Sequence, residues 1–292
     1  MSTIGFDTSN YTTSTAWTDG KTDINVRQIL YVKDGERGIR QSDGVFQHMK
    51  LMPVMYEKLS EQIDFKDVNA VGVSTRPRCV EGSYMPVFLA GEGYAKVVAN
   101  TLGVTLYEFS HQDGHIMAGI YSSGSFELLE NDFISVHLSG GTTEILKSRY
   151  NEFNFDNEII GGSKDISAGQ FIDRVGVKMG LHFPAGKALE QLALKAEKGE
   201  KLPIAVDGAY MNFSGVETKA SRMAESEKCD KSALALGVLE NVRDTLVKTI
   251  NKAMTDTNTH RVLIVGGVAS NGIIRNGLTK KLDGDVYFAK SE

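Results

Sequence analysis

The sequence has few cysteines, no long hydrophobic run and no excess of positive charge. Its two cysteines, Cys79 and Cys229, lie far apart and outside any metal-binding spacing, which favours a reducing, cytoplasmic location and two ordinary thiols. No run approaches the roughly 18 apolar residues that a membrane span needs. The N-terminus has no basic stretch followed by an apolar core. We therefore expect neither a membrane helix nor a signal peptide.

The charge balance excludes one class of nucleic-acid binder. A formal net charge of −5 and a pI near 5.8 argue against a broad basic face that grips nucleic acid by itself. They leave open a local basic patch, or an RNA substrate presented by partner proteins. With 41% hydrophobic and 24% charged residues, the composition is typical of a globular protein. A length of 292 residues is enough for two domains that each bury a core.

A short pattern of residues occurs twice, once in each half of the chain. The first copy is STIGFDTSNYTTSTAW near the N-terminus, and the second is ISVHLSGGTTEIL at 134–146. Each predicts a strand, a turn rich in Ser, Thr and Gly, and a second strand. Backbone N–H groups and hydroxyls in such a turn contact phosphate oxygens, and Gly140 and Gly141 allow a close approach. Two copies predict two lobes that clamp one phosphorylated ligand; a pair of ordinary hairpins is the alternative.

Strands and helices alternate along the rest of the chain, which is typical of an α/β protein. The stripe from Leu234 to Met254, with apolar residues every three or four positions, predicts one face of a buried helix. A small, polar and acidic segment at 122–131 predicts a boundary between an N-terminal lobe, 1–124, and a C-terminal lobe, 125–292. We expect strands at 3–8, 12–17, 24–32, 69–74, 104–109, 133–138, 143–149, 152–161 and 261–265, and helices at 45–63, 86–102, 111–121, 167–180, 186–199 and 232–256.

Two histidines stand four residues apart at the start of a predicted helix. Ser110 and Asp113 form a variant of the capping box, so His111 and His115 lie on one helix face. This spacing lets two imidazoles share one transition metal, with Asp or Glu as further ligands. The alternative is a pair of half-exposed histidines. Gln112 occupies the place of the glutamate in zinc proteases, which leaves peptide hydrolysis without an obvious general base.

A glycine pair follows an apolar strand near the C-terminus. Gly266 and Gly267 precede Asn271 and a helical pattern. The glycines permit flat contact with a base or ribose, and Asn271 either caps the helix or binds a sugar hydroxyl. A tight turn between strand and helix is the alternative.

Two acidic residues flank a third glycine turn. Asp173 lies on the helix that follows the second hairpin, and Gly186 begins the next helix, which carries Glu190. The two carboxylates are candidates for binding ribose hydroxyls or a bridging Mg²⁺. Solvent-exposed acids on helices are the alternative.

Together these motifs resemble the TsaD/Gcp family of tRNA threonylcarbamoyladenosine synthases. They come in the family's order and cover essentially the whole chain. The family patterns H-x-x-G-H, S-G-G-H-T, D-x-A-G-E-x-F-D-K, L-x-Y-P-G-G-P-x-I-E, F-S-G-x-K-T and G-G-V-A-x-N are similar to residues 111–115, 139–143, 165–174, 181–190, 213–218 and 266–271.

The resemblance implies a fold, an activity and a set of site residues. The fold is that of actin, hexokinase and the heat-shock ATPases (ASKHA), with two duplicated RNase H-like lobes around a nucleotide cleft. The activity is an acyl transfer, in which a threonylcarbamoyl group moves from an adenylate to the exocyclic amine of an adenosine in tRNA. No side chain is implied as a nucleophile. The implied nucleotide-binding residues are Asp7, Ser9, Leu138, Ser139, Gly140, Gly141, Thr142, Asp173, Gly186, Glu190, Gly266, Gly267 and Asn271.

The resemblance also implies cofactors and partners. One divalent metal, iron or zinc, is expected at His111 and His115, where it would orient or polarise the donor. Mg²⁺ is a candidate companion of the adenine nucleotide. The tRNA is expected to arrive through a multi-protein complex, with a paralogous protein or a second copy of this chain as partner, in the cytoplasm and without a membrane.

Several positions depart from the family patterns. The acidic first turn E-T-S-C-D-E/D-T corresponds to 7–13, where two acids are lost, with Asn10 among the replacements. Arg76 and Arg78 replace residues of V-T-x-G-P-G-L, and Thr142 replaces the turn histidine. The family's aspartate ligand follows a strand like 285–288 and would fall beyond residue 292.

These departures support an alternative from a different class, a nucleotide-binding paralogue that serves as a scaffold or regulatory subunit. A sugar or acetate-type kinase of the same fold is disfavoured, because paired histidines have no place in its mechanism and no catalytic aspartate is evident.

Overall fold

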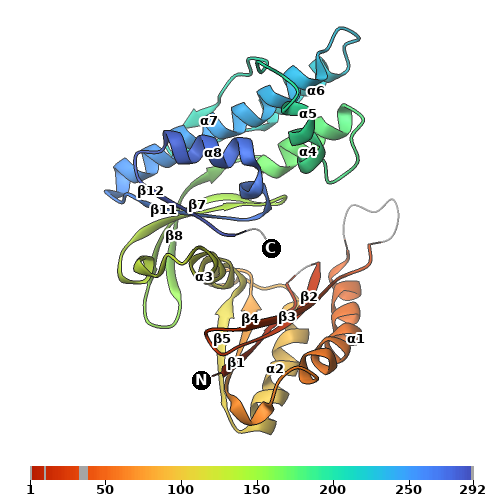
Figure 1. Cartoon of the computed structure of the whole chain (residues 1–292), viewed down its shortest axis with the longest axis vertical. Helices are drawn as coiled ribbons and strands as arrows, with labels where there is room; N and C mark the ends of the chain where they lie inside the picture. The colour runs from red at the N-terminus through yellow and green to blue at the C-terminus, as the bar shows by residue number, and fades with distance from the viewer. Residues whose placement is uncertain (1, 10, 33–38, 291–292) are drawn as a thin grey trace. The chain divides into compact units, whose positions relative to one another are not determined.

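A computed structural model of the chain describes residues 2–9, 11–32 and 39–290. Their contacts form two compact units, one ending at Gly114 and the other beginning at His115, within the first turns of helix α3 (His111–Ser123; Figure 1). This division does not test which segments fold independently, so the boundary between 124 and 125 stays a prediction. Asn10 of the first turn lies outside the described residues.

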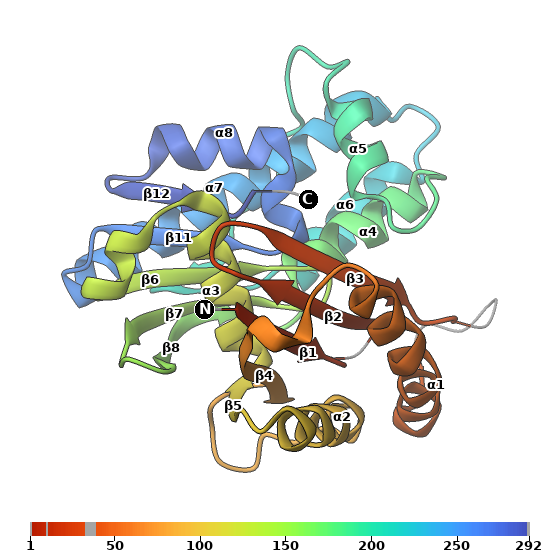
Figure 2. The same cartoon turned by 60° about the horizontal axis from the view of Figure 1, so that its bottom comes forward.

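The N-terminal unit has a five-stranded sheet in the order β3-β2-β1-β4-β5. The first three strands are antiparallel neighbours, and β4 and β5 run parallel to β1. Ile4 and Phe6 alternate with more exposed residues along β1 and pack on one helical layer, which lies under the sheet in Figure 2. The elements are β1 (Ser2–Asp7), β2 (Thr12–Thr18), β3 (Asp23–Ile29), α1 (Gln41–Ser60), η1 (Phe65–Asp67), β4 (Val68–Arg76), α2 (Phe88–Leu102) and β5 (Thr105–Ser110).

The C-terminal unit repeats this strand order. Its sheet runs β12-β11-β6-β7-β8-β10-β9, with β6, β7 and β8 antiparallel and β11 and β12 parallel to β6. The order 8-7-6-11-12 therefore matches 3-2-1-4-5, which confirms the duplication predicted from the two hairpins. The strands are β6 (Phe133–Leu138), β7 (Thr143–Tyr150), β8 (Phe155–Ser163), β9 (Val206–Asp207), β10 (Tyr210–Met211), β11 (Arg261–Val265) and β12 (Asp285–Phe288).

Both faces of the second sheet are covered, so most residues of the strands β6 and β11 are buried. Ile134 and Val136 face one core with the larger helical layer (Figure 1). Phe133 and Leu263 face the opposite core, which Ile116 and other side chains of α3 complete. The remaining helices are η2 (Phe126–Glu130), α4 (Ala168–Lys178), α5 (Gly186–Ala193), α6 (Ser214–Ala224), α7 (Lys231–Thr257), η3 (Gly267–Ser270) and α8 (Gly272–Lys281).

The long helix α7 confirms the predicted buried stripe. Asp230 caps its first turn, accepting hydrogen bonds from the N–H groups of Ser232 and Ala233 at 2.9 and 3.0 Å. The six stripe residues are all at most 2% exposed: Leu234, Val238, Val242, Leu246, Ile250 and Met254. Among the described residues, no helix is long and apolar enough to span a membrane.

A ladder of polar side chains crosses three strands inside the second sheet. The Ser148 hydroxyl donates to Asn157 Oδ1 at 2.7 Å and lies 2.7 Å from the Ser135 hydroxyl. Since the proton of Ser148 is directed to Asn157, Ser135 donates to Ser148. Both serines are at most 1% exposed, so the ladder satisfies hydroxyls that water does not reach.

Two predicted helices have other bounds in the structure, and one helix was not predicted. The predicted helix 45–63 begins four residues earlier, at Gln41, and tolerates Pro53 on its exposed face. The predicted helix 186–199 ends at Ala193, and Gly199 lies beyond it against the backbone of α7, where an added Cβ would be 2.9 Å from Gly237 N. Helix α6 was not predicted, because polar residues dominate its sequence.

Candidate functional site

The turn between β6 and β7 is held by one of its own side chains. Ser139 Oγ accepts hydrogen bonds from the N–H groups of Gly141 and Thr142 at 3.3 and 3.0 Å. Ser139 N–H donates to the Thr142 carbonyl at 2.9 Å. A Cβ added to Gly140 or Gly141 would meet no atom within 4 Å, so the glycine backbone faces open space. The predicted turn is therefore compact on one side and open on the other.

Helix α4 packs directly against this turn. Ser167 begins the helix with a capping box and donates its hydroxyl to the Gly140 carbonyl at 2.8 Å. Thr143 Oγ1 accepts from Ala168 N at 2.8 Å. A Cβ on Gly169 would lie 2.5 Å from the Ser139 carbonyl oxygen, so only glycine fits there. The helix start thereby fixes the position of the turn.

The glycine loop after β11 lies against the end of β6. Gly266 has a φ of +103°, and a Cβ there would be 2.3 Å from the Leu138 carbonyl oxygen. Gly267 faces open space, and Asn271 caps α8 by accepting from Ile273 N and Ile274 N, both at 3.1 Å. Because β6 and β11 are parallel neighbours, both loops stand at the carboxyl ends of their strands, where α/β sheets bind ligands.

Asp173 on α4 and Glu190 on α5, which flank the turn at Gly186, both accept hydrogen bonds from backbone N–H groups. Asp173 Oδ1 accepts from Ala185 N at 2.7 Å, which joins α4 to the start of α5 at Gly186. Burial raises the pKa of Asp173, against hydrogen bonds from the Ala185 and Gly186 backbone that lower it. Glu190 Oε1 accepts from Gly272 N at 2.6 Å and joins α5 to α8. Both carboxylates are partly buried and accept backbone hydrogen bonds, and their binding of ribose hydroxyls or Mg²⁺ stays a prediction.

These contacts close a ring within the C-terminal unit. The β6–β7 turn contacts α4, Asp173 links α4 to α5, Glu190 links α5 to α8, and Gly266 returns to Leu138. Every predicted nucleotide-binding residue from Leu138 to Asn271 lies on this ring. The structure thus brings together residues that are far apart in the sequence.

Asp7 is the last residue of β1, and its carboxylate accepts several hydrogen bonds at the turn between β1 and β2. Ser9 donates its N–H at 2.7 Å and its hydroxyl to Asp7 Oδ1, and His111 Nδ1 lies 3.0 Å from Asp7 Oδ2. Burial raises the pKa of Asp7, but the hydrogen bonds and charge of His111, with further bonds from Ser74 and Ser9, outweigh it and hold the pKa below its usual range. The sequence analysis did not single out Ser74; its one signal is its position as the last residue of the predicted strand 69–74.

The predicted cap of α3 is confirmed. Ser110 N donates to Asp113 Oδ2 at 2.9 Å, and Asp113 N donates to Ser110 Oγ at 3.1 Å. The helix therefore begins at His111, with His115 one turn later. The ring of His115 lies 4.9 Å, between centroids, from that of His137 on β6, a residue that sequence reasoning did not single out.

The histidines fit a metal in their donor chemistry. The carboxylate of Asp7 holds Nδ1 of His111, as carboxylates commonly do for histidines that bind an ion through the other ring nitrogen. Imidazole nitrogens suit zinc and iron. Within residues 2–9, 11–32 and 39–290, no three His, Cys, Asp or Glu side chains are already gathered as a metal-ligand set.

A bulge lies near the end of β4, just before Arg76, and Arg78 follows in the next loop. The pairing of β4 with β5 shifts between Ser74 and Arg76, and Arg76 Nη1 donates to Thr75 Oγ1 at 3.1 Å. The Pro77 carbonyl accepts from Gln112 N at 3.1 Å, which ties the loop to the first turn of α3.

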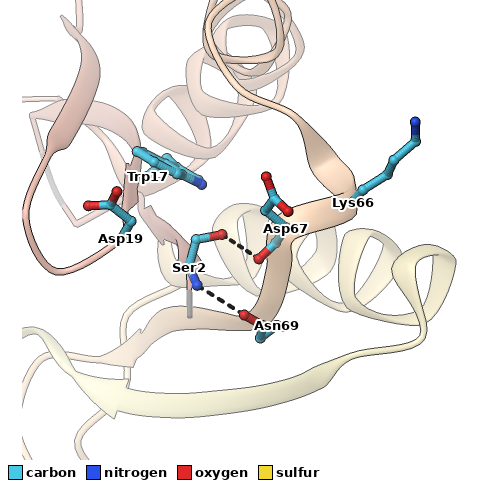
Figure 3. A pocket seen from close by; sticks show the side chains of 6 residues that line it. All are labelled: Ser2, Trp17, Asp19, Lys66, Asp67 and Asn69. Atoms are coloured by element: carbon cyan, nitrogen blue, oxygen red, sulfur yellow. Dashed lines mark hydrogen bonds between the residues drawn. The ribbon is translucent and has the colours of Figure 1, made fainter.

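A separate hollow of about 390 Å³ in the N-terminal unit contains none of the predicted residues (Figure 3). There Ser2 bonds to Asn69 Oδ1 and the Asp67 carbonyl at 3.0 and 2.7 Å. This is where β1 and β4 begin, at the opposite end of the strands from Asp7. We assign the hollow no role, because ligands of such sheets bind at the carboxyl ends.

Known proteins resemble this chain over nearly its full length. A family model described as TsaD, tRNA N6-adenosine threonylcarbamoyltransferase, matches residues 37–292. The chain belongs to the TsaD family. A tRNA N6-adenosine threonylcarbamoyltransferase of Thermus thermophilus is 31% identical over 283 residues, covering 93% of this chain and 82% of the relative. A probable bifunctional tRNA threonylcarbamoyladenosine biosynthesis protein of Methanothermobacter thermautotrophicus is 28% identical, covering 82% of this chain and 43% of that protein.

Solved structures share the fold of this TsaD-family chain. HypF from T. kodakarensis has a TM-score of 0.63 at 13% identity, covering 99% of this chain and 45% of its own. Full-length HypF in a phosphate- and nucleotide-bound form has a TM-score of 0.61 at 15% identity, covering 98% of this chain and 52% of its own. The family resemblance and the ASKHA fold are confirmed.

Proposed function

We propose that this TsaD-family chain is an acyltransferase that modifies tRNA. It moves a threonylcarbamoyl group from its adenylate to N6 of an adenosine. The amine attacks the carbamoyl carbon, the bond from that carbon to the phosphate oxygen breaks, AMP leaves with the electron pair, and the amine loses a proton. The match of the TsaD family model to residues 37–292 is the observation that carries this proposal.

We place the adenylate on the ring of the C-terminal unit. The open glycines of the β6–β7 turn and the Gly266–Gly267 loop suit phosphate and ribose, because main chain without Cβ atoms permits close approach. Asp173 and Glu190 hold the frame through backbone hydrogen bonds, and their carboxylates are the acceptors that we propose for the sugar hydroxyls. The nucleotide-bound HypF, which has this fold, supports nucleotide binding by the chain.

Asp7, Ser9, His111 and His115 complete the proposed site residues. The ionised carboxylate of Asp7 orients His111, and the Ser9 hydroxyl, whose proton is donated to Asp7, keeps its oxygen for a Mg²⁺ ion that accompanies the nucleotide. His111 and His115 would hold the iron or zinc ion. When bound, that ion supplies Lewis acidity toward the carbamoyl donor. tRNA and a paralogous subunit, in the cytoplasm, are the proposed partners.

The transfer assay tests this function directly. Purified chain and its partner proteins receive labelled threonylcarbamoyl-adenylate and tRNA, and the modified nucleoside is counted. We expect transfer by the wild type, its loss in the double variant His111→Ala/His115→Ala, and AMP binding in both. The double variant His182→Ala/His260→Ala is the matched control and keeps both properties. Binding of AMP without transfer by the wild type would instead favour the scaffold alternative.

A further inference from the structure

Arg76 lies at the edge of the N-terminal sheet where three parallel strands end. Asp7 is the last residue of β1, Arg76 of β4 and Ser110 of β5. In the parallel pairing Arg76 lies opposite Ser110, and His111 follows Ser110 directly as the first residue of α3. Ligands of α/β sheets bind at the carboxyl ends of the strands. A cationic side chain therefore occupies a ligand-binding edge, beside the strand that leads into His111.

The loop that follows Arg76 is held by hydrogen bonds of its main chain. The Pro77 carbonyl accepts from Gln112 N at 3.1 Å, which ties the loop to the first turn of α3. Arg78 N donates to Ser83 Oγ at 3.0 Å and closes the loop on itself. Because both bonds involve the residues directly after Arg76, its backbone is fixed before a ligand arrives, and less ordering entropy is lost on binding.

Within the part of the chain that the structure describes, the guanidinium of Arg76 contacts neutral side chains only. Nη1 donates to Thr75 Oγ1 at 3.1 Å, and Nη2 lies 3.7 Å from Cys79 Sγ. Arginine carries several N–H donors, so others remain for an acceptor. The side chain is partly buried, where the attraction between opposite charges is stronger than in open water. These properties suit an oxyanion ligand.

The carboxylate at the same edge binds other partners. Asp7 ends the neighbouring strand, and its Oδ1 accepts from Ser9 while its Oδ2 lies 3.0 Å from His111 Nδ1. Ser74, the residue of β4 that reaches Asp7, adds a further hydrogen bond to this carboxylate. The positive charge of Arg76 is therefore not committed to an ion pair with Asp7.

The family resemblance does not account for this arginine. The pattern V-T-x-G-P-G-L has a glycine at the position of Arg76. Glycine gives clearance and no charge, whereas a guanidinium offers a planar fork of donors that matches a carboxylate or a phosphate. The open glycines that we propose for the phosphate lie in the C-terminal unit, on the ring from Leu138 to Asn271. The anion that remains for Arg76 is the threonyl carboxylate, on the acyl end of the donor that the ion at His111 would polarise.

We propose that Arg76 binds the carboxylate of the threonylcarbamoyl donor and selects acyl groups that carry this carboxylate. The inference deepens the proposed function and rests on it. Arg76 makes and breaks no covalent bond; it positions the acyl group while the amine attacks the carbamoyl carbon. A donor without the carboxylate would leave the partly buried guanidinium without its acceptor, and it should react more slowly.

A matched pair of donors tests the assignment in the tRNA transfer assay. Threonylcarbamoyl-adenylate is compared with a donor whose threonyl carboxylate is a neutral carboxamide. We expect the wild-type kcat/KM to be roughly 10- to 100-fold lower with the carboxamide donor, because a hydrogen bond to a charged group is lost. Arg76→Gln should use the two donors equally, and Arg76→Lys should restore part of the preference. Arg149→Gln, at an exposed position of β7, should keep the wild-type preference.

Labelling of Cys79 detects the carboxylate without any transfer step, and it uses the wild-type chain. The exposed Cys79 thiol lies 3.7 Å from Arg76 Nη2, and Cys229 in the C-terminal unit is the internal reference. We expect N-carbamoyl-threonine to slow the alkylation of Cys79 by neutral iodoacetamide and to leave that of Cys229 unchanged. Its carboxamide analogue and AMP should slow neither reaction.

The two experiments separate the role of Arg76 from the proposed function. Equal transfer from both donors by the wild type would overturn the assignment and leave the proposed function standing. A preference for the carboxylate donor that persists in Arg76→Gln would also overturn it, as would protection of Cys79 by inorganic phosphate as strong as that by N-carbamoyl-threonine. Protection of Cys79 by N-carbamoyl-threonine without transfer to tRNA would support Arg76 as the carboxylate ligand and contradict the proposed function.

Discussion

One carboxylate, that of Asp165, joins two segments of the C-terminal unit that are 48 residues apart. It accepts hydrogen bonds from Phe213 N at 2.8 Å and from the N–H and hydroxyl of Ser214 at 2.9 and 2.5 Å, at the start of α6. Burial raises the pKa of Asp165, but these bonds to the ionised form outweigh it and lower the pKa to about 2. The ionised side chain thus anchors α6.

Replacing Asp165 by Asn should lower the free energy of unfolding by about 1 kcal/mol at neutral pH, because a charge-assisted cap becomes a neutral one. The folded-state pKa of about 2 lies below the ordinary 3.8. The stabilisation is therefore fully present above about pH 4 and is lost as the pH falls toward 2. Urea unfolding of both proteins at pH 7 and pH 3 measures this. An equal difference at the two pH values would contradict the role of the charge.

At the scale of secondary-structure elements, the contact between α4 and the β6–β7 turn sets the geometry of the proposed nucleotide site. An alanine in place of a helical glycine ordinarily stabilises a helix by up to about 1 kcal/mol. At Gly169 the added Cβ would lie 2.5 Å from the Ser139 carbonyl oxygen and 2.6 Å from Gly140 Cα. Neither backbone atom moves without shifting the turn.

We expect Gly169→Ala to lower AMP affinity about tenfold and the free energy of unfolding by about 1–3 kcal/mol, the usual range for overpacking. Gly215→Ala in α6 is the matched control, since a Cβ there meets no atom within 4 Å. That variant should keep its AMP affinity and lose no stability. Calorimetry with AMP and chemical unfolding report the two effects. Unchanged AMP affinity in Gly169→Ala would remove the turn from the proposed site.

The same contacts explain how much could be predicted from the sequence. The strands β6 and β11 and the helix α7 were predictable because their apolar patterns are continuous or strongly periodic. The capping boxes at Ser110 and Ser167 are local and mark where their helices start. Residues recruited only by tertiary neighbours carry no such signal, so Ser74 and His137 were missed and the anchoring bond of Glu190 to Gly272 was not foreseen.

At the scale of the whole molecule, the two units share a strand order and keep separate cores. Ile4 and Phe6 pack with α1 and α2, while Ile134 and Val136 pack with the helices of the second unit. The C-terminal unit is the larger of the two, because β9, β10 and most helices are added there to the shared strand order. The proposed adenylate contacts at the β6–β7 turn and the Gly266–Asn271 loop fall on this larger unit.

Nucleotide binding should therefore slow amide hydrogen exchange more in the C-terminal unit than in the N-terminal unit. With AMP at 100 times its dissociation constant, AMP binding raises the free energy of unfolding by about 2.7 kcal/mol. We expect slower amide exchange at 139–142, at the start of α4 and at 266–274, with little change in α1. Hydrogen exchange read by mass spectrometry, with and without AMP, measures this. Protection centred on α1 and α2 would contradict the proposed placement.

The polar ladder across β6, β7 and β8 bears on how this sheet assembles. If the register of a strand pair shifted by two residues, the same side chains would still face the core. Hydrophobic burial alone would therefore not disfavour the shifted register. It would, however, leave the hydroxyls of Ser135 and Ser148 without acceptors in a dry interior, at about 1–3 kcal/mol for each group. These two hydroxyls therefore favour the aligned pairing of β6, β7 and β8 over a pairing shifted by two residues.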